Sequence, residues 1–261
     1  MVALSFLTVL PATLNRMPTP REISNSRAYY PAVGLLFGLL LIGLERGCRE
    51  VFPIYLTAAV LLVALIAGTR GLHLDGLMDV CDGLFGGYTR ERRLEIMRDS
   101  RVGAFGVAGA AAVLLLKYGA LVSLLSLSQV GSRSVDLKWP LLLFPMLSRW
   151  SMVVVLGAFP YARRQGLASP FHQGGAKWAT SAAAAAAAVA SVLLGGAGGA
   201  AIFAGASVLA WLLGRAMAGM LGGLTGDTYG ATNEMTEAAV LLAAVAALPH
   251  GWIKPLPLLS I

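Results

Sequence analysis

The chain has 261 residues, of which 57% are hydrophobic and 13% charged, and its formal net charge is +7. Soluble domains average about 25% charged residues, so this composition excludes an ordinary soluble domain and favours an integral membrane protein. Its two cysteines are too few for a disulfide framework or a thiolate metal site. We expect residues 1–261 to form a single membrane-embedded domain, with no nucleic-acid partner.

An apolar stretch, residues 1–14, opens the chain and ends before Arg16, Pro18 and Pro20. This stretch has no basic leading region and no clear small-residue cleavage site, so it is not predicted to be a cleaved signal peptide. A short interfacial or re-entrant helix is expected there instead.

Seven later apolar stretches are candidate membrane spans. They are predicted at residues 31–44, 54–69, 102–130, 139–159, 178–194, 200–221 and 237–248. The first and last are short for a span. The sequence therefore predicts an all-α, polytopic integral membrane helical bundle with about seven spans.

The most informative segment, residues 71–83, follows the second stretch and carries three carboxylates, Asp75, Asp79 and Asp82. Spacings of four and three residues place them within roughly 60° of one another on a helix. Ionised groups are costly against lipid, so this acidic face must border a polar cavity and a compensating charge. A solvated face with paired charges explains the motif less well, because no basic residue lies between Asp75 and Asp82.

A divalent cation, predicted to be Mg²⁺, is the simplest compensating charge, because hard cations take carboxylate oxygens. Along the helix axis Asp75 and Asp79 would lie about 6 Å apart, and Asp79 and Asp82 about 4.5 Å. Each pair can share an ion, whereas all three would reach one ion only on a bent helix, so one or two metal ions fit. His73 is a candidate general base, with a hydrogen-bonded structural role as the alternative.

An arginine-rich segment, residues 90–101, comes next, and its weakly amphipathic pattern predicts an interfacial helix. Guanidinium groups bind phosphate oxygens in a bidentate manner. Arg98 and Arg101, the two nearest the following span, are therefore predicted to bind substrate. Anchoring to anionic lipid is the alternative for this segment.

Two more arginines are candidates for substrate binding. Arg149 lies within the stretch 139–159, where a charge usually faces a functional cavity or pairs with an acid. An ion pair with one of the aspartates is the alternative. Arg163 follows the same stretch, and anchoring at the inner membrane face is its alternative.

A glycine-rich acidic segment, residues 222–237, precedes the last stretch and contains Asp227, Glu234 and Glu237 but no basic residue. Glycine-rich loops free backbone N–H groups for phosphates, while carboxylates suit hydroxyl groups or a metal. These three acids are predicted to bind substrate or a second metal. As an alternative, Asp227 or Thr228 simply caps the last helix.

Basic residues orient the chain in the membrane. With the N-terminus inside, twelve of the 20 Lys and Arg fall in inner segments and five in outer ones, which places these motifs on the cytoplasmic side. Carboxylates, arginines and a glycine–acid loop at one face suit metal-dependent phosphoryl or nucleotidyl transfer with a bulky or lipid-like substrate.

Residues 72–87, 90–103 and 223–237 resemble the signature segments of the cobalamin synthase family, the adenosylcobinamide-GDP ribazoletransferases. Weaker positions of the family also agree, among them Arg149, Tyr161, Arg163 and Gly166. Met78 is a departure, since a smaller residue is more usual there.

The resemblance implies a Mg²⁺-dependent enzyme of late vitamin B12 synthesis in the bacterial cytoplasmic (inner) membrane. It would join adenosylcobinamide-GDP to α-ribazole or its 5′-phosphate and release GMP. Besides these substrates and the lipid bilayer, the expected partners are a second copy of the chain or other enzymes of the cobalamin pathway.

Two other classes of protein remain as alternatives. A CDP-alcohol phosphotransferase also uses spaced aspartates on a membrane helix, but its pattern places Ala-Arg after the first Asp-Gly, where this chain has Leu77 and Met78. A cation transporter would need a polar path across the spans, whereas the acidic motifs cluster near one face. A purely structural scaffold would leave the aspartates unexplained.

Overall fold

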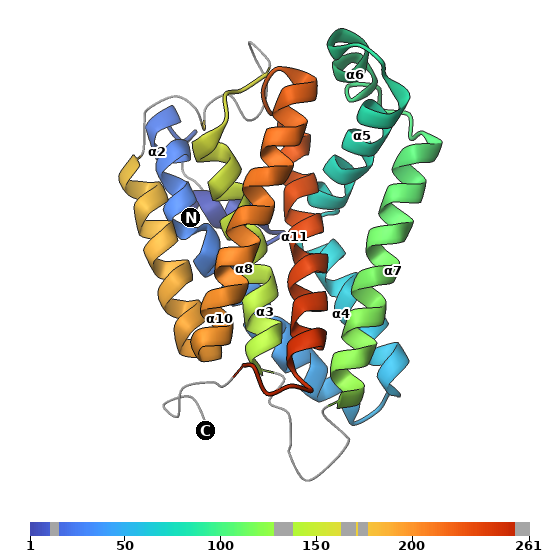
Figure 1. Cartoon of the computed structure of the whole chain (residues 1–261), viewed down its shortest axis with the longest axis vertical. Coiled ribbons are helices and arrows are strands. Elements are labelled where there is room, and N and C mark those ends of the chain that lie inside the picture. Colours follow the sequence, from blue (N-terminus) through green and yellow to red (C-terminus); the bar gives the residue numbers. More distant parts are fainter. Residues whose placement is uncertain (11–15, 128–137, 163–170, 172–176, 254–261) are drawn as a thin grey trace.

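The computed structural model describes residues 1–10, 16–127, 138–162, 171 and 177–253 as a bundle of helices (Figure 1). Within these residues the sole strand-like feature is an isolated parallel bridge between Tyr161 and Leu224, so the prediction of an all-α membrane fold is confirmed. The elements are α1 (Val2–Leu7), α2 (Pro20–Asn25), η1 (Ser26–Tyr29), α3 (Tyr30–Arg49), α4 (Ile54–Gly68), α5 (Leu72–Gly86), α6 (Arg90–Ile96), α7 (Ala104–Leu127), α8 (Lys138–Ala158), α10 (Lys177–Leu221) and α11 (Gly226–Ala247).

The predicted count of seven spans is not confirmed. By length and composition, four helices in the described residues can cross a membrane, and a fifth is added if α4 and α5 form one bent span. The four are Pro20–Arg49, Ala104–Leu127, Lys138–Ala158 and Lys177–Leu221. All seven predicted stretches nevertheless lie largely within helices.

The difference arises partly in α10, which unites two of the predicted stretches in 45 residues. Its helix is broken at Gly196, whose φ of 58° and ψ of −139° suit a residue without a Cβ atom. A Cβ atom on Gly199 would overlap the carbonyl of Ser191, so the chain reverses tightly at this point. Figure 1 accordingly shows α10 as two antiparallel legs.

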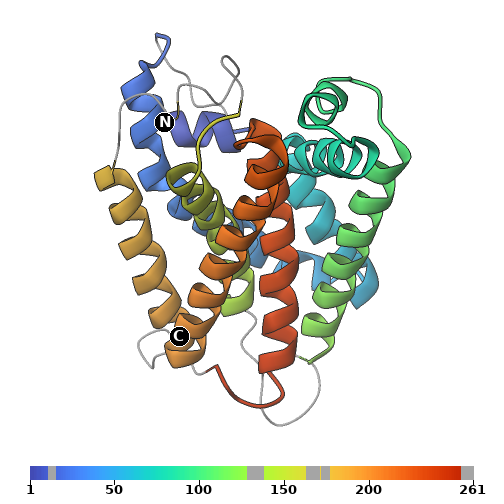
Figure 2. The same cartoon turned by 45° about the horizontal axis from the view of Figure 1, so that its top comes forward.

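A second break separates α4 from α5, which meet at an angle of 86°. The chain turns at Arg70 (φ 56°) and Gly71 (φ 70°), both in the left-handed region. The Gly71 N–H closes the turn by donating to the Ile66 carbonyl at 2.8 Å. As a result, α5 (teal) lies across one end of the bundle instead of extending the α4 span (Figure 2).

The interior of the bundle is built around α8, which packs against α3, α10 and α11. Helix α3 approaches α8 closely, because a Cβ atom on Gly34 would overlap the Pro145 carbonyl. Apolar side chains such as Leu143, Phe144 and Met146 are completely buried in α8. This core fixes the helices from which the polar segments extend.

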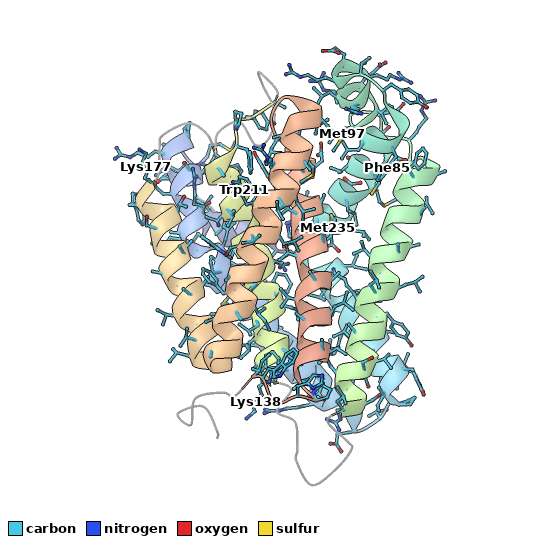
Figure 3. The ribbon with its side chains drawn as sticks, in the orientation of Figure 1. Phe85, Met97, Lys138, Lys177, Trp211 and Met235 are labelled. Carbon is cyan, nitrogen blue, oxygen red and sulfur yellow. The ribbon has the colours of Figure 1, made fainter. Side chains whose placement is uncertain are left out.

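The polar segments gather at one end of the bundle, which we call the arginine-rich end. Figure 3 places Lys177 at this end and Lys138 at the opposite end. Helices α2 and α6 lie at the same end as Lys177 (Figure 1). Their arginines are Arg21, Arg90, Arg92 and Arg93, and Arg98 and Arg101 follow α6 directly.

Candidate active site

The acidic motif and the glycine–acid segment meet where α5 crosses α11. A Cβ atom on Gly76 would lie 2.7 Å from the Asp227 carbonyl oxygen and 3.0 Å from its Cα atom. One turn along α11, a Cβ atom on Gly230 would lie 3.0 Å from the Cα atom of His73. Glycine at both positions therefore lets the two backbones touch, and Asp227 comes to lie beside the acidic face of α5.

We expect Gly76→Ala to push α11 away from α5, because the new methyl group would meet backbone atoms that cannot rotate aside. The expected cost is about 1–3 kcal/mol of unfolding free energy, together with a loss of activity. Gly119→Ala in α7 is the matched control, since nothing lies within 4 Å of its Cβ position. Thermal unfolding in detergent measures the stability of both variants. Equal stability of Gly76→Ala and Gly119→Ala would contradict the close approach of α5 and α11.

The three aspartates of α5 lie on one helical face, as the spacing predicted, because α5 is continuous from Leu72 to Gly86. Their exposure falls along the helix: Asp75 is exposed, Asp79 is half-buried and Asp82 is buried. Asp75 opens into a cavity of about 570 Å³ between α1 and the α4–α5 bend. The cavity is lined by Ser5, Phe6, Thr8, Thr69, Arg70, Gly71, Leu72, Leu74, Asp75 and Met78.

The side chain of Asp82 has a structural role at the start of α7. Its two carboxylate oxygens accept the backbone N–H groups of Gly103 and Gly106, each at 2.8 Å. Gly103 directly precedes α7 and Gly106 lies in its first turn, where N–H groups need such acceptors and the helix dipole favours a negative charge. A Cβ atom on either glycine would overlap the carboxylate. Asp82 therefore anchors the start of α7 to α5.

Asp82→Ala is expected to lower the unfolding free energy by about 1–2 kcal/mol, because α7 loses the acceptor for two N–H groups. Asp82→Asn keeps one acceptor oxygen and should lose less. Thermal unfolding of the purified protein ranks the three proteins, and an alanine variant as stable as the parent would rule out the anchoring role.

With Asp82 engaged by α7, the remaining carboxylates of α5 suit a hard cation that is held partly by the protein and partly by a substrate. Within the described chain, no three His, Cys, Asp or Glu side chains are arranged as a metal cluster. Mg²⁺, however, is commonly held by one or two protein carboxylates, several waters and substrate phosphates. Asp75 and Asp79, four residues apart on α5, are a set of that kind, and the backbone of Asp227 lies against Gly76 in the same helix.

The predicted phosphate-binding arginines follow α6, in the segment that leads to α7. Arg98 is exposed, and Arg101 donates to both carboxylate oxygens of Asp99, the shortest bond being 2.6 Å. This pairing holds the pKa of Asp99 at about 2, so both partners are charged at neutral pH. A cavity of about 360 Å³, lined by Arg101 and Asp82 among others, lies between these segments. Arg101 would have to exchange Asp99 for a phosphate to bind substrate.

The other arginines of α6 fasten this helix to the end of α10. Arg93 donates to the carbonyls of Gly87 (2.9 Å) and Met220 (3.3 Å). The guanidinium of Arg90 packs against Gly222, whose φ of 71° ends α10. The arginine-rich segment is thus held next to the glycine–acid segment.

The chain after α8 joins the same assembly. The Leu224 N–H donates to the Pro160 carbonyl, and the Ala162 N–H donates to the Leu224 carbonyl, both at 2.8 Å. These two bonds place the segment that leads to Arg163 beside the glycine–acid segment. Arg163 itself lies outside the described residues.

The cap of α11 is Thr225, not Asp227 or Thr228 as the alternative reading held. The Thr225 hydroxyl accepts the Thr228 N–H at 3.4 Å, and the Thr228 hydroxyl accepts the Thr225 N–H at 3.0 Å. The carboxylate of Asp227 accepts a hydrogen bond from the Thr225 hydroxyl at 3.1 Å. Asp227 therefore lies in the first turn of α11 as a partner of the cap.

Glu234, Glu237 and Arg149 are not at the rim but deep in the bundle. Arg149 pairs with Glu237 at 2.5 Å, so its ionic partner is a glutamate of α11 instead of an aspartate of α5. Lys117 of α7 pairs with both glutamates, at 2.6 Å to Glu234 and 2.5 Å to Glu237. Lys117 was not among the predicted site residues, although a single lysine in an apolar stretch is a signal of a functional or paired charge.

His73 lies next to this buried cluster. It is 1% exposed, and within the described residues neither ring nitrogen has a hydrogen-bond partner. Because it precedes Asp75 by two residues, it projects about 200° around α5 from that side chain. His73 is therefore turned towards α11, away from the acidic face where a general base would be needed.

Comparison with known proteins connects this site to a family. The sequence profile described as cobalamin-5-phosphate synthase matches residues 1–245. The chain belongs to this family. The resemblance seen in the motifs is thereby confirmed, and it is this family, not the CDP-alcohol phosphotransferases or the cation transporters, that the chain matches.

Members of the family with curated names cover almost the whole chain. The adenosylcobinamide-GDP ribazoletransferase of Desulfitobacterium hafniense is 39% identical over 249 residues, which are 95% of this chain and 96% of the relative. Those of Desulforamulus reducens and Pseudomonas paraeruginosa are each 40% identical, over 92% and 93% of this chain and 93% and 96% of the relatives. No solved structure is significantly similar to the chain.

Proposed function

We propose that this chain joins adenosylcobinamide-GDP to α-ribazole, or to its 5′-phosphate, with release of GMP. This is the last assembly step of the nucleotide loop of vitamin B12. The observation that carries the proposal is the backbone contact between Gly76 and Asp227, which brings the glycine–acid segment against the acidic helix α5 in a member of this family. Arg92 and Arg101 line one cavity with Asp82, the last aspartate of the acidic face, and transfer from a diphosphate requires such cationic groups near the site.

In the proposed reaction, the acceptor hydroxyl oxygen attacks the phosphorus attached to cobinamide. The bond from this phosphorus to the bridging oxygen breaks, GMP departs with that oxygen, and the hydroxyl proton is lost to the medium. Asp75 and Asp79 would hold Mg²⁺ together with the substrate phosphates. When bound, the cation neutralises charge on the diphosphate oxygens. Arg98 and Arg101 would orient those oxygens for in-line attack.

The site is proposed to face the cytoplasm from the inner membrane. Lys and Arg are enriched in cytoplasmic segments of membrane proteins, and α5, which carries the three aspartates, lies next to α6 towards the arginine-rich end of this bundle (Figure 1). The GDP-linked donor is charged and either acceptor is polar, so both substrates would reach the site from that side. The apolar helices below it would keep the protein at the membrane.

The proposal is tested by incubating the purified protein, reconstituted in lipid, with adenosylcobinamide-GDP and either acceptor. Mass spectrometry of the products should show one corrinoid product per GMP, with Mg²⁺ and not with excess chelator. CDP-diacylglycerol serves as the donor for the alternative enzyme class. A folded protein that gives no corrinoid product from either acceptor would refute the proposed reaction.

A further inference from the structure

Four charged side chains form a neutral cluster inside the bundle, below the acidic face. Lys117 comes from α7, Arg149 from α8, and Glu234 and Glu237 from α11. Glu234 is 6% exposed and the other three are 1% exposed. Charges this deeply buried are tolerated only when they are paired and hydrogen-bonded, so the cluster constrains how the three helices pack.

Glu237 is the centre of the cluster. One carboxylate oxygen accepts bonds from Arg149 (2.5 Å), Asn233 (3.2 Å) and Ser148 (3.3 Å). The other oxygen accepts from Lys117, which also reaches Glu234 at 2.6 Å. Lys117 is therefore the group that joins the two glutamates of α11 to each other and to α7.

The position of these glutamates along α11 connects the cluster to the site. Glu234 follows Asp227 by seven residues, which is two turns, so the two side chains lie within about 20° of one another around the helix. Glu237 follows Gly230 by the same interval. A rotation of α11 that moved Glu234 away from Lys117 would therefore also turn Asp227 away from α5.

At Gly76 and Gly230 the backbones of α5 and α11 approach closely, and neither glycine carries a side chain that could lock one helix against the other. The ion pairs of Lys117 are short and directional, and they lie on the two faces of α11 that carry Asp227 and Gly230. The small residues permit the approach and the buried charges fix its orientation.

We propose that Lys117 is a positioning residue. By joining Glu234 and Glu237 it fixes the rotation of α11 that holds the backbone of Asp227 against Gly76 of α5. The role in catalysis rests on the proposed function, whereas the role in orienting α11 does not depend on it. Lys117 itself lies too deep in the bundle to touch the substrate.

The experiment separates positioning from charge balance with four variants. Lys117→Met leaves two carboxylates facing one cation, and Lys117→Met with Glu234→Gln restores neutrality without restoring the link. Lys117→Arg keeps the charge and the link. Lys177→Met removes a lysine from an exposed position at the arginine-rich end and is the matched control.

Two measurements are made on each variant. The first is kcat and KM for both substrates. The second is the distance distribution between spin labels at Phe85→Cys on α5 and Met235→Cys on α11, in a background without Cys48 and Cys81. Both labelled positions have exposed side chains, and both are visible in Figure 3. This second measurement needs no activity.

We expect the neutral double variant to fold with a thermal midpoint near that of the parent, yet to lose about 100-fold in kcat with little change in KM. Its label distances should shift or broaden, while Lys117→Arg and Lys177→Met keep both parent values. A double variant with parental kcat and distances would show that Lys117 only balances charge, which overturns the proposal. If the double variant does not fold, Lys117→Arg provides the test. A parental kcat together with altered label distances in Lys117→Arg would show that the orientation of α11 does not control catalysis, and this would also overturn the proposal.

An inactive parent protein would refute the proposed function but not this inference. The label distances would still report whether Lys117 orients α11, and unchanged distances in the double variant would refute it separately.

Discussion

Asp79→Asn should abolish transfer, with a loss of about 10³-fold or more in kcat, in a protein that stays folded in detergent. Asp79 is the middle carboxylate of the acidic face and is half-buried, next to the position where Asp227 reaches α5. The amide has nearly the same shape but no charge, so packing is kept while the proposed Mg²⁺ and diphosphate site loses a ligand. Activity is followed as GMP released and folding as the thermal midpoint.

The control for Asp79→Asn is Glu91→Gln, which neutralises an exposed acid in the first turn of α6 at the same end of the bundle. It should keep parental kcat. Raising the Mg²⁺ concentration should not restore the Asp79 variant. Near-parental activity of that variant at high Mg²⁺ would contradict the role of Asp79 as a metal ligand.

Glu237→Gln is expected to cause the largest loss of stability, about 3–5 kcal/mol of unfolding free energy. The carboxylate of Glu237 is the joint partner of Lys117 and Arg149. Without its charge, the cluster holds two buried cations and one carboxylate, that of Glu234. Lys117 keeps Glu234 as its partner, whereas Arg149 loses the ion pair with Glu237. Unfolding of the reconstituted protein by increasing amounts of denaturing detergent measures the change.

Two comparisons identify the cause of that loss. Glu237→Gln combined with Arg149→Met restores neutrality and should recover part of the stability. Glu95→Gln breaks the exposed pair between Arg92 and Glu95, and it should change stability by less than about 1 kcal/mol. A Glu237 variant no less stable than the Glu95 variant would mean that the buried cluster contributes nothing to the fold.

The sequence was sufficient wherever the answer depended on neighbours along the chain. The spacing of Asp75, Asp79 and Asp82 predicted one acidic helical face, because the geometry of a helix is set by local hydrogen bonds. Apolar runs predicted the helices of the bundle for the same local reason. The long motif at residues 72–87 was specific enough to indicate the family that the comparisons confirmed.

The tertiary structure decided how distant residues pair. Asp82 finds its N–H donors 21 and 24 residues later, and Arg149 finds Glu237 after 88 residues. No local pattern encodes such partners, since they depend on which helix faces pack together.

The dependence on distant partners also explains why the span count was not confirmed and why Lys117 was not predicted. Whether α5 continues α4 depends on left-handed conformations at Arg70 and Gly71, and whether Lys117 is stable inside the bundle depends on two glutamates from another helix. The sequence by itself therefore determined which helices and which chemistry this protein has. The packing of those helices decided which charges face the site and which stabilise its frame, because a buried charge is acceptable only beside the partner that the fold supplies.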